Sequence, residues 1–348
     1  MTVRWPGIQT SAEFLKSYVP PDYVVDHVLQ QGYLYSMTGT TGSGKTSVSL
    51  RIAAHVALGL PLGDIEVERG RVLFLAGENP IDIRMRWAAM ARAMNADLSN
   101  VDVHFVPGTF NIKTFMEKVS EWANKIGGAS LVVVDTAIAY FEGNNENDNV
   151  QMVEYAQLLR SFTTLKGKPC VLVNCHPSKR GNDAMPRGGG SFLNEVDGNL
   201  TCRKALGEDV ATIGWAEKFR GPPFEPFMME LVQVDGPMTD SKGRTLPTIV
   251  AQPLSAMSAG ALQRTKQAEE HAVLAVCLET PGASYAELAD ALRWQNAAGA
   301  LYKMKVQRVM KRLATFGYVT VHKDGWELTK TGQEQRVNGL DTGSNLPN

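Results

Sequence analysis

Gly39-Thr40-Thr41-Gly42-Ser43-Gly44-Lys45-Thr46 is the stretch that decides the fold of this chain. It matches the pattern G-x-x-x-x-G-K-[ST] and lies between a predicted strand at 32–37 and a predicted helix at 47–58, which is the context a phosphate-binding loop requires. The glycines let backbone N–H groups surround phosphate oxygens, and the helix N-terminus adds the positive end of its dipole. We therefore expect this loop to bind ATP, with Lys45 reaching the terminal phosphates and Thr46 binding Mg²⁺. A glycine-rich connection without a ligand is the alternative.

Around this loop, short apolar runs alternate with helical stretches from about residue 33 to 250. This alternation predicts an α/β fold on a mostly parallel sheet with helices on both faces. Further strands are expected at 71–76, 101–106, 130–135 and 170–175, separated by helices at 81–94, 115–125 and 150–165. The run 130–135 is continuously apolar up to its last residue, which is typical of a strand buried on both faces. Later strands, at 198–203, 211–219 and 227–234, are expected to be antiparallel.

A second, smaller unit follows. Helices are predicted at 265–279, 284–292 and 298–316, the second opened by a capping box of Ser284 and Glu287. A hairpin with an Asp324-Gly325 turn comes next, which completes the element order of a winged-helix domain. The expected organisation is an N-terminal segment at 1–22, an α/β nucleotide-binding domain at 23–250, a linker at 251–264, a winged-helix domain at 265–333 and a disordered tail at 334–348.

The composition excludes several classes of protein. The 348 residues contain 35 Lys and Arg against 36 Asp and Glu, so the chain has no overall attraction to nucleic acid. No stretch approaches the roughly 18 apolar residues of a membrane span, and the first residues do not read as a signal peptide. A cytoplasmic protein without membrane association is expected. The four cysteines, none in a CxxC pair, predict reduced thiols and not a disulfide framework or zinc site.

Three further side chains are candidates for the chemistry at the phosphate loop. Asp135 ends the apolar strand 130–135, where a carboxylate can hold Mg²⁺ through water; a helix cap is the alternative. Glu78 follows the strand 71–76 at the same expected edge of the sheet and is the candidate general base; a contact capping the next helix is the alternative. His176 follows the strand 170–175 and is placed to sense the terminal phosphate, or else it is a structural histidine.

Taken in order, these motifs resemble those of the RecA-type ATPases, and among them the RepA-like replicative helicases of plasmids and phages, over about residues 20–234. The resemblance implies a RecA-like core in which Glu78 acts on water and His176 is the γ-phosphate sensor. Lys218 and Arg220, in Lys218-Phe219-Arg220-Gly221-Pro222, are similar to the element that inserts cations into the neighbouring subunit's ATP site. A homo-oligomer, expected to be a hexameric ring, follows from that similarity. A solvated strand end is the alternative for these two cations.

Two basic segments are candidates for DNA contact. Where RecA-type proteins carry DNA-contacting loops, the glycine-rich segment 178–192 holds Lys179, Arg180 and Arg187, which could neutralise backbone phosphates; a flexible surface loop is the alternative. Between 293 and 312 the chain has no Asp or Glu. The cations of that stretch, expected to contact phosphates beside a major groove unless the unit binds protein, are Arg293, Lys303, Lys305, Arg308, Lys311 and Arg312.

The leading hypothesis is an ATP- and Mg²⁺-dependent replicative DNA helicase that translocates on single-stranded DNA and also meets duplex DNA. The plasmid or phage setting, and a replication initiator or loader as partner, come from the resemblance alone. The helicases of that family need not carry a winged-helix domain, which weakens the transfer of the role. A recombinase or recombination mediator, and a DNA-binding regulator switched by ATP, are the alternatives.

Overall fold

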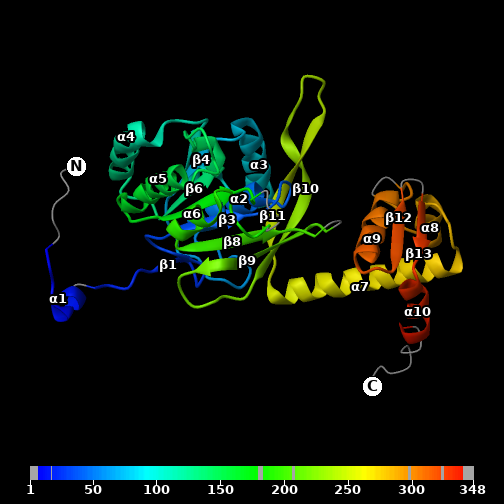
Figure 1. Ribbon diagram of the computed structural model, residues 1–348. Coiled ribbons are helices and arrows are strands. Elements are labelled where there is room, and N and C mark those ends of the chain that lie inside the picture. The colour runs from blue at the N-terminus through cyan, green and yellow to red at the C-terminus, as the bar shows by residue number, and fades with distance from the viewer. Residues whose placement is uncertain are drawn as a thin grey trace, which may run out of the picture.

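A mostly parallel sheet forms the centre of the structure, a computed structural model that describes residues 7–16, 18–178, 183–205, 208–296, 299–322 and 325–339. Six adjacent strands of this sheet are parallel and three at one side are antiparallel. This arrangement confirms the predicted α/β class (Figure 1). The strands, in the order in which they lie side by side, are β11 (Thr245–Pro253), β10 (Phe227–Thr239), β9 (Val210–Phe219), β8 (Gly198–Arg203), β3 (Leu34–Thr38), β7 (Cys170–Cys175), β6 (Leu131–Asp135), β4 (Val72–Ala76) and β5 (Val103–Pro107).

The central strands are buried along their whole length. Every residue of β3, β4, β6 and β7 is buried, which explains why their sequences are apolar runs without alternation. Helices cover both faces of the sheet, so odd- and even-numbered side chains of each strand are both buried. The phosphate loop and the first turn of α2 (Lys45–Leu58) begin where β3 ends, at the carboxyl edge of the sheet.

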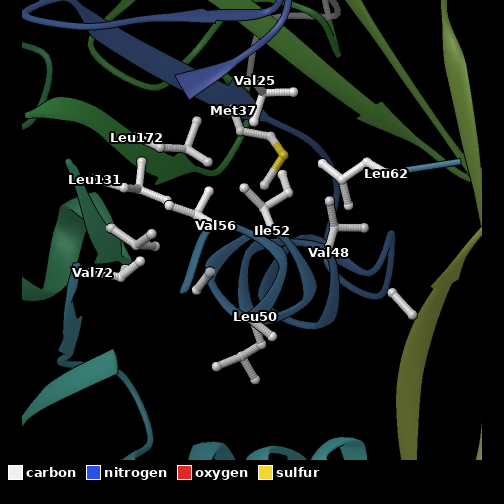
Figure 2. Close-up of a cluster of buried hydrophobic side chains, with 14 of the residues drawn as sticks. Val25, Met37, Val48, Leu50, Ile52, Val56, Leu62, Val72, Leu131 and Leu172 are labelled. Carbon is white, nitrogen blue, oxygen red and sulfur yellow. The ribbon is translucent and has the colours of Figure 1, made fainter. Parts of the chain in front are cut away.

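Helix α2 packs on one face together with α3 (Pro80–Ala93). Figure 2 shows Val48, Ile52 and Val56 pointing from α2 toward Met37 and Leu172 of the neighbouring strands. Each of these side chains is at most 2% exposed. Fully burying one such aliphatic group contributes about 1.5–3 kcal/mol, so this contact holds the start of α2, and with it the phosphate loop, against the sheet.

The other face carries α4 (Ile112–Lys125), α5 (Asn149–Arg160) and α6 (Gly189–Glu195), with the short helices η2 (Ala137–Tyr140) and η3 (Ser161–Thr164). Their buried side chains form a second core with the opposite faces of β4, β6 and β7. Smaller elements outside these layers are α1 (Ser11–Lys16), β1 (Tyr23–Val25), β2 (Leu29–Gln30) and η1 (Leu98–Asn100).

The C-terminal unit has a core of its own. Three helices are followed by a two-stranded antiparallel hairpin and a last helix, and the side chains buried between them form a separate cluster. The predicted capping box is present, since Ser284 Oγ accepts from the backbone of Glu287 while the Glu287 carboxylate accepts from that of Ser284. The elements are α7 (Ala256–Glu279), α8 (Tyr285–Ala291), α9 (Lys303–Thr315), β12 (Val319–His322), β13 (Gly325–Leu328) and α10 (Lys330–Gly339).

Two segments expected to lack regular structure contain it. In the expected linker 251–264, β11 continues to Pro253 and α7 starts at Ala256. The Ala256 N–H donates to Asp64 Oδ2 at 2.7 Å, which ties the start of α7 to the α/β domain. Residues 334–339, expected to be disordered, continue α10, and the rest of that segment lies outside the described residues. Within the described part of the chain, no helix combines the length and apolarity needed to cross a membrane.

Candidate functional site

A cavity of about 410 Å³ lies at the carboxyl ends of the parallel strands, where open α/β sheets bind their ligands. Side chains from segments far apart in the chain line it. The phosphate loop and α2 supply Lys45 and Thr46, the segment after β4 supplies Glu78, and Asp135 and His176 follow from the ends of β6 and β7. The structure thus brings the residues predicted to bind phosphate and metal together with Glu78 and His176, two of the residues predicted for catalysis.

The phosphate loop, Gly39 to Thr46, is held in a tight turn by two glycines. Gly44 has φ 97°, and a Cβ there would lie 2.8 Å from the Leu231 side chain. A Cβ on Gly39 would lie 2.4 Å from the Cys202 carbonyl oxygen, so no other residue fits this approach of loop to β8. Lys45 Nζ donates to the carbonyls of Gly39 at 2.6 Å and Thr40 at 3.1 Å. Burial lowers the pKa of Lys45, and anionic phosphates are better partners for its ammonium than these carbonyls.

Asp135 is the centre of a buried polar network. Its carboxylate accepts from Thr46 Oγ1 at 2.9 Å and from Asn174 Nδ2 at 2.8 Å. Ser49 Oγ donates to the other side of the same amide, Asn174 Oδ1, at 2.9 Å. Burial raises the pKa of Asp135, while the two hydrogen bonds act to lower it. Both donors are side chains, from α2 and β7, and not backbone N–H groups at a helix start, which is against the helix-cap alternative.

Sequence reasoning missed Asn174 and Ser49. The signal for Asn174 was the single amide in the otherwise apolar Val171-Leu172-Val173-Asn174-Cys175 run. A polar side chain in a strand buried on both faces requires a partner, and the strand order places that partner on β6. Ser49 gave no signal, because a serine on a helix facing a sheet is common.

The donors around Asp135 fit a magnesium ion. The Thr46 hydroxyl and the Asp135 carboxylate, which are hard oxygen ligands, lie together at the cavity wall. Thr136 Oγ1 and Ser43 Oγ, on either side of this pair in the chain, are buried and have no hydrogen-bond partner. Among the described residues no cluster of three or more His, Cys, Asp or Glu could hold a metal. Mg²⁺ is usually held by one or two protein oxygens together with water and phosphate, which the Thr46 hydroxyl and the Asp135 carboxylate would supply.

Glu78 is free to face the cavity because its neighbour caps the following helix. The Asn79 side chain accepts from the Asp82 N–H at 3.1 Å as the N-cap of α3, so the capping alternative for Glu78 is wrong. The N–H groups of Gly77 and Glu78 donate to the Asp135 carbonyl at 2.8 Å and 3.2 Å. These two bonds fix the Glu78 backbone beside the end of β6.

His176 stands between the cavity and the loop that follows β7. Burial, and secondarily the charge of Lys45, lower its pKa, so the imidazole is neutral near pH 7 and can both donate and accept a hydrogen bond. Its carbonyl accepts from the Arg187 N–H at 2.8 Å. A change in the hydrogen bonding of the His176 ring can therefore reach the segment 178–192, predicted to contact DNA, through this backbone bond to Arg187.

Lys218 and Arg220 lie at the opposite edge of the sheet. Strand β9 runs antiparallel to β8, and Phe219 between them pairs with Gly198, the first residue of β8. Arg220 Nη1 is 3.1 Å from Asp197 Oδ1 and its side chain is 62% exposed, while Lys218 Nζ donates to the Asn194 carbonyl. Neither residue lines the cavity of its own protomer.

The basic loop after β7 is only partly described. Lys179 and Arg180 lie outside the described residues. Arg187 is ion-paired, because its Nη1 is 3.3 Å from Glu146 Oε2. Its Nε is buried and has no hydrogen-bond partner. The predicted contact of Arg187 with DNA would require this ion pair to open.

The cations of α9 are largely compensated, which corrects the interpretation of residues 293–312 as uncompensated charge. Lys305 Nζ is 2.7 Å from Glu269, and Arg312 Nε is 2.7 Å from Glu270, both on α7. Arg308 Nη1 is 2.9 Å from Asp209, just before β9. The sequence window contained no acid because the acids come from other elements. The cations of this stretch that remain exposed are Arg293, Lys303 and Lys311.

Lys45 and Asp135 converge on one cavity at the carboxyl edge of a mostly parallel sheet, an arrangement that defines the class of P-loop nucleoside triphosphatases. A family model described as an AAA domain matches residues 7–182, just over half of the 348-residue chain. The chain belongs to this family, and it carries an AAA-type ATPase domain. No curated protein matches it. The family match ends before β8, so the roles of Lys218, Arg220 and the C-terminal unit stay predictions.

Replacing Glu78 by Gln tests the general base. The amide keeps the size of the side chain but cannot accept a proton, so we expect ATP binding to remain and turnover to fall at least about 100-fold. A phosphate-release assay measures turnover, and a fluorescent ATP analogue measures binding. Glu121→Gln, on the exposed surface of α4, is the matched control. Turnover within a few-fold of the wild type would assign the proton transfer to another group.

Replacing Asn174 by Ala tests the network around Asp135. Burial raises the pKa of this carboxyl, so protonation competes with Mg²⁺ as the pH falls, and Mg²⁺-dependent affinity for ATP is lost below that pKa. The Asn174 amide lowers the pKa; without it the pKa rises and the loss occurs at higher pH.

Calorimetric titration of a non-hydrolysable ATP analogue from pH 5 to 8, with Mg²⁺ or with EDTA, measures this shift. Asn149→Ala, at the start of α5, is the control. An unchanged pH midpoint in the Asn174 variant would mean that the amide does not act on Asp135.

Proposed function

We propose that this protein is a Mg²⁺-dependent ATPase that assembles into a ring and translocates on single-stranded DNA as a replicative helicase. The observation that carries the proposal is the position of Lys218 and Arg220. They lie at the edge of the sheet opposite the cavity, and their resemblance to cations that act on ATP therefore requires the cavity of a neighbouring copy. A ring places one edge of each copy against the other edge of the next.

The residues around the cavity divide the chemistry between them. Lys45 and the loop N–H groups bind the phosphates, and Thr46 with Asp135 would hold Mg²⁺, which supplies charge neutralisation at the terminal phosphates when bound. Glu78 accepts the proton of the attacking water, and neutral His176 hydrogen-bonds the terminal phosphate. Arg220 and Lys218 of the next copy stabilise the charge that develops in the transition state.

Contact with DNA is assigned to the loop after β7 and to the C-terminal unit, whose order of three helices and a hairpin supports the predicted winged-helix domain. His176 joins the first of these to the cavity, and the exposed cations Lys303 and Lys311 lie on α9. A DNA-binding regulator switched by ATP is the second candidate. The contact between Asp209 and Arg308 favours this regulator, because Asp209 both lines the ATP cavity and pairs with Arg308 on α9.

Unwinding of a forked DNA duplex by the purified protein with ATP and Mg²⁺ tests the helicase activity. We expect the labelled strand to be released only when ATP is hydrolysed, with Lys45→Ala as the inactive control, because its loop lacks the ammonium that binds phosphate. Hydrolysis stimulated by single-stranded DNA but without unwinding would favour the recombinase, to be examined by strand exchange. The absence of hydrolysis would favour the regulator.

Mixing two inactive variants tests the shared site. Arg220→Ala should bind ATP normally and hydrolyse it slowly, since a cation of this kind contributes about 1,000-fold or more to phosphoryl transfer. Lys45→Ala lacks a working cavity but keeps Arg220, so mixed rings should regain activity at the Arg220→Ala cavities. Arg244→Ala, on the β10–β11 turn, is the control for loss of an exposed arginine. Activity that does not rise in the mixture would rule out action between copies.

A further inference from the structure

The connector between β8 and β9 lies against the nucleotide cavity. Its described residues are 204, 205, 208 and 209, and the Lys204 and Asp209 side chains line the same cavity as Lys45 and Asp135. The Asp209 carbonyl accepts from the Leu231 N–H at 2.6 Å, which anchors the backbone at the end of the connector to β10 and leaves the Asp209 side chain and the preceding residues able to move. A charge that enters the cavity therefore acts directly on this segment.

The same connector holds the C-terminal unit through ion pairs. Asp209 Oδ2 is 2.9 Å from Arg308 Nη1 on α9. Glu208 forms a close ion pair with Lys266 on α7, and its Oε1 is 3.6 Å from Arg312 Nε. We refer to Glu208 and Asp209 as the acidic connector.

Charge is balanced only while the acidic connector stays in place. Four cations of the C-terminal unit, which we call the basic face, meet the two acids of the connector and two from α7, Glu269 and Glu270. Removing the connector leaves four cations against two acids, an excess of two positive charges. The cations of the basic face are Lys266, Lys305, Arg308 and Arg312.

We propose that the acidic connector covers a nucleic-acid binding surface, the basic face, and that nucleotide in the cavity uncovers it. This inference rests on the proposed function and names the regulation of its DNA contact. Nucleotide phosphates attract Lys204 toward the cavity and repel the Asp209 carboxylate from it. These opposed forces on the two ends of the connector turn it and break the pair of Asp209 with Arg308. Backbone phosphates of nucleic acid then replace the two carboxylates.

Exposure decides which pairs exchange. The side chains of Arg308 and Asp209 are 40% and 50% exposed, so water and salt screen their attraction and the pair opens readily. Arg312 is 8% exposed and keeps Glu270 as its partner, so it remains as an internal support of α9. Arg308 therefore passes first from carboxylate to phosphate. Lys266 is 16% exposed beside Glu208 at 20%, so it follows only when the whole connector has moved and its partner is lost.

The test measures DNA binding by the double variant Glu208→Gln/Asp209→Asn. Binding is measured as the fluorescence anisotropy of labelled single-stranded and duplex oligonucleotides at fixed salt. We expect about tenfold tighter binding than the wild type without nucleotide, since two phosphate contacts are gained, and little further change on adding a non-hydrolysable ATP analogue. The wild type should reach the same affinity only with the analogue.

Glu225→Gln/Asp235→Asn is the matched control. It removes the same charge from exposed positions of the same domain, neither of which lines the cavity. Equal tightening in the control would reduce the effect to net charge and overturn the proposal. Wild-type affinity and wild-type nucleotide response in the connector variant would overturn it as well.

A second measurement distinguishes movement of the connector from binding of the oligonucleotide. The four native cysteines are buried, so dyes can be attached to cysteines introduced at exposed Ala205, on the connector, and exposed Lys311, on α9. Energy transfer between the two dyes then follows the distance from the connector to the basic face. We expect transfer to fall when the analogue binds the wild type, and to be low from the start in the connector variant. Constant transfer despite bound analogue would overturn the nucleotide-driven opening. Opening without oligonucleotide binding in either protein would overturn the nucleic-acid assignment and, with it, the proposed function.

Discussion

The site depends on one buried carboxylate. Asp135 is 1% exposed, and an ionised group at such a position is tolerated only when polar partners replace the water it has lost. Thr46 and Asn174 supply them, and they can do so because β7 lies between the strand of the phosphate loop and the strand of Asp135. The strand order of the sheet therefore determines which residues form the site. A different strand between β3 and β6 would leave the Asp135 carboxylate without the Asn174 amide.

Local patterns predicted the sheet and the loop, whereas partners distant in the chain could not be read from the sequence. The continuous apolar runs identify strands buried on both faces because each strand carries that information itself. Asn174 bonds across 39 residues to Asp135, and Ser49 across 125 to Asn174, so their pairing exists only after the strands are ordered. For Glu78, the structure decided between two roles by giving the cap of α3 to the adjacent Asn79.

Charge in the C-terminal unit shows the same limit. The stretch 293–312 lacks acids, but its cations face Glu269 and Glu270 on α7 and Asp209 from the α/β domain, which lie outside any local window. The expected linker failed for a related reason. Ser258 and Gly260 lower the intrinsic helix propensity of residues 256–264, yet the contact of Ala256 with Asp64 and the Ser255 cap start α7 there. Tertiary contacts outweighed the weak local preference.

Strand β9 lies between the acidic connector, which we propose moves, and Arg220, which stays with the sheet. It is hydrogen-bonded to β8 on one side and β10 on the other, so it moves only with the sheet. Asp209 precedes it at the cavity edge, and Arg220 follows it at the opposite edge. The exchange proposed for the acidic connector breaks the ion pairs of Glu208 and Asp209 and leaves the hydrogen bonds of the sheet and the Asp135 network intact. Lys218 and Arg220, which we propose act on a neighbouring copy, thus keep their position whether the proposed basic face is covered or free. Under both proposals, hydrolysis and nucleic-acid binding are regulated separately.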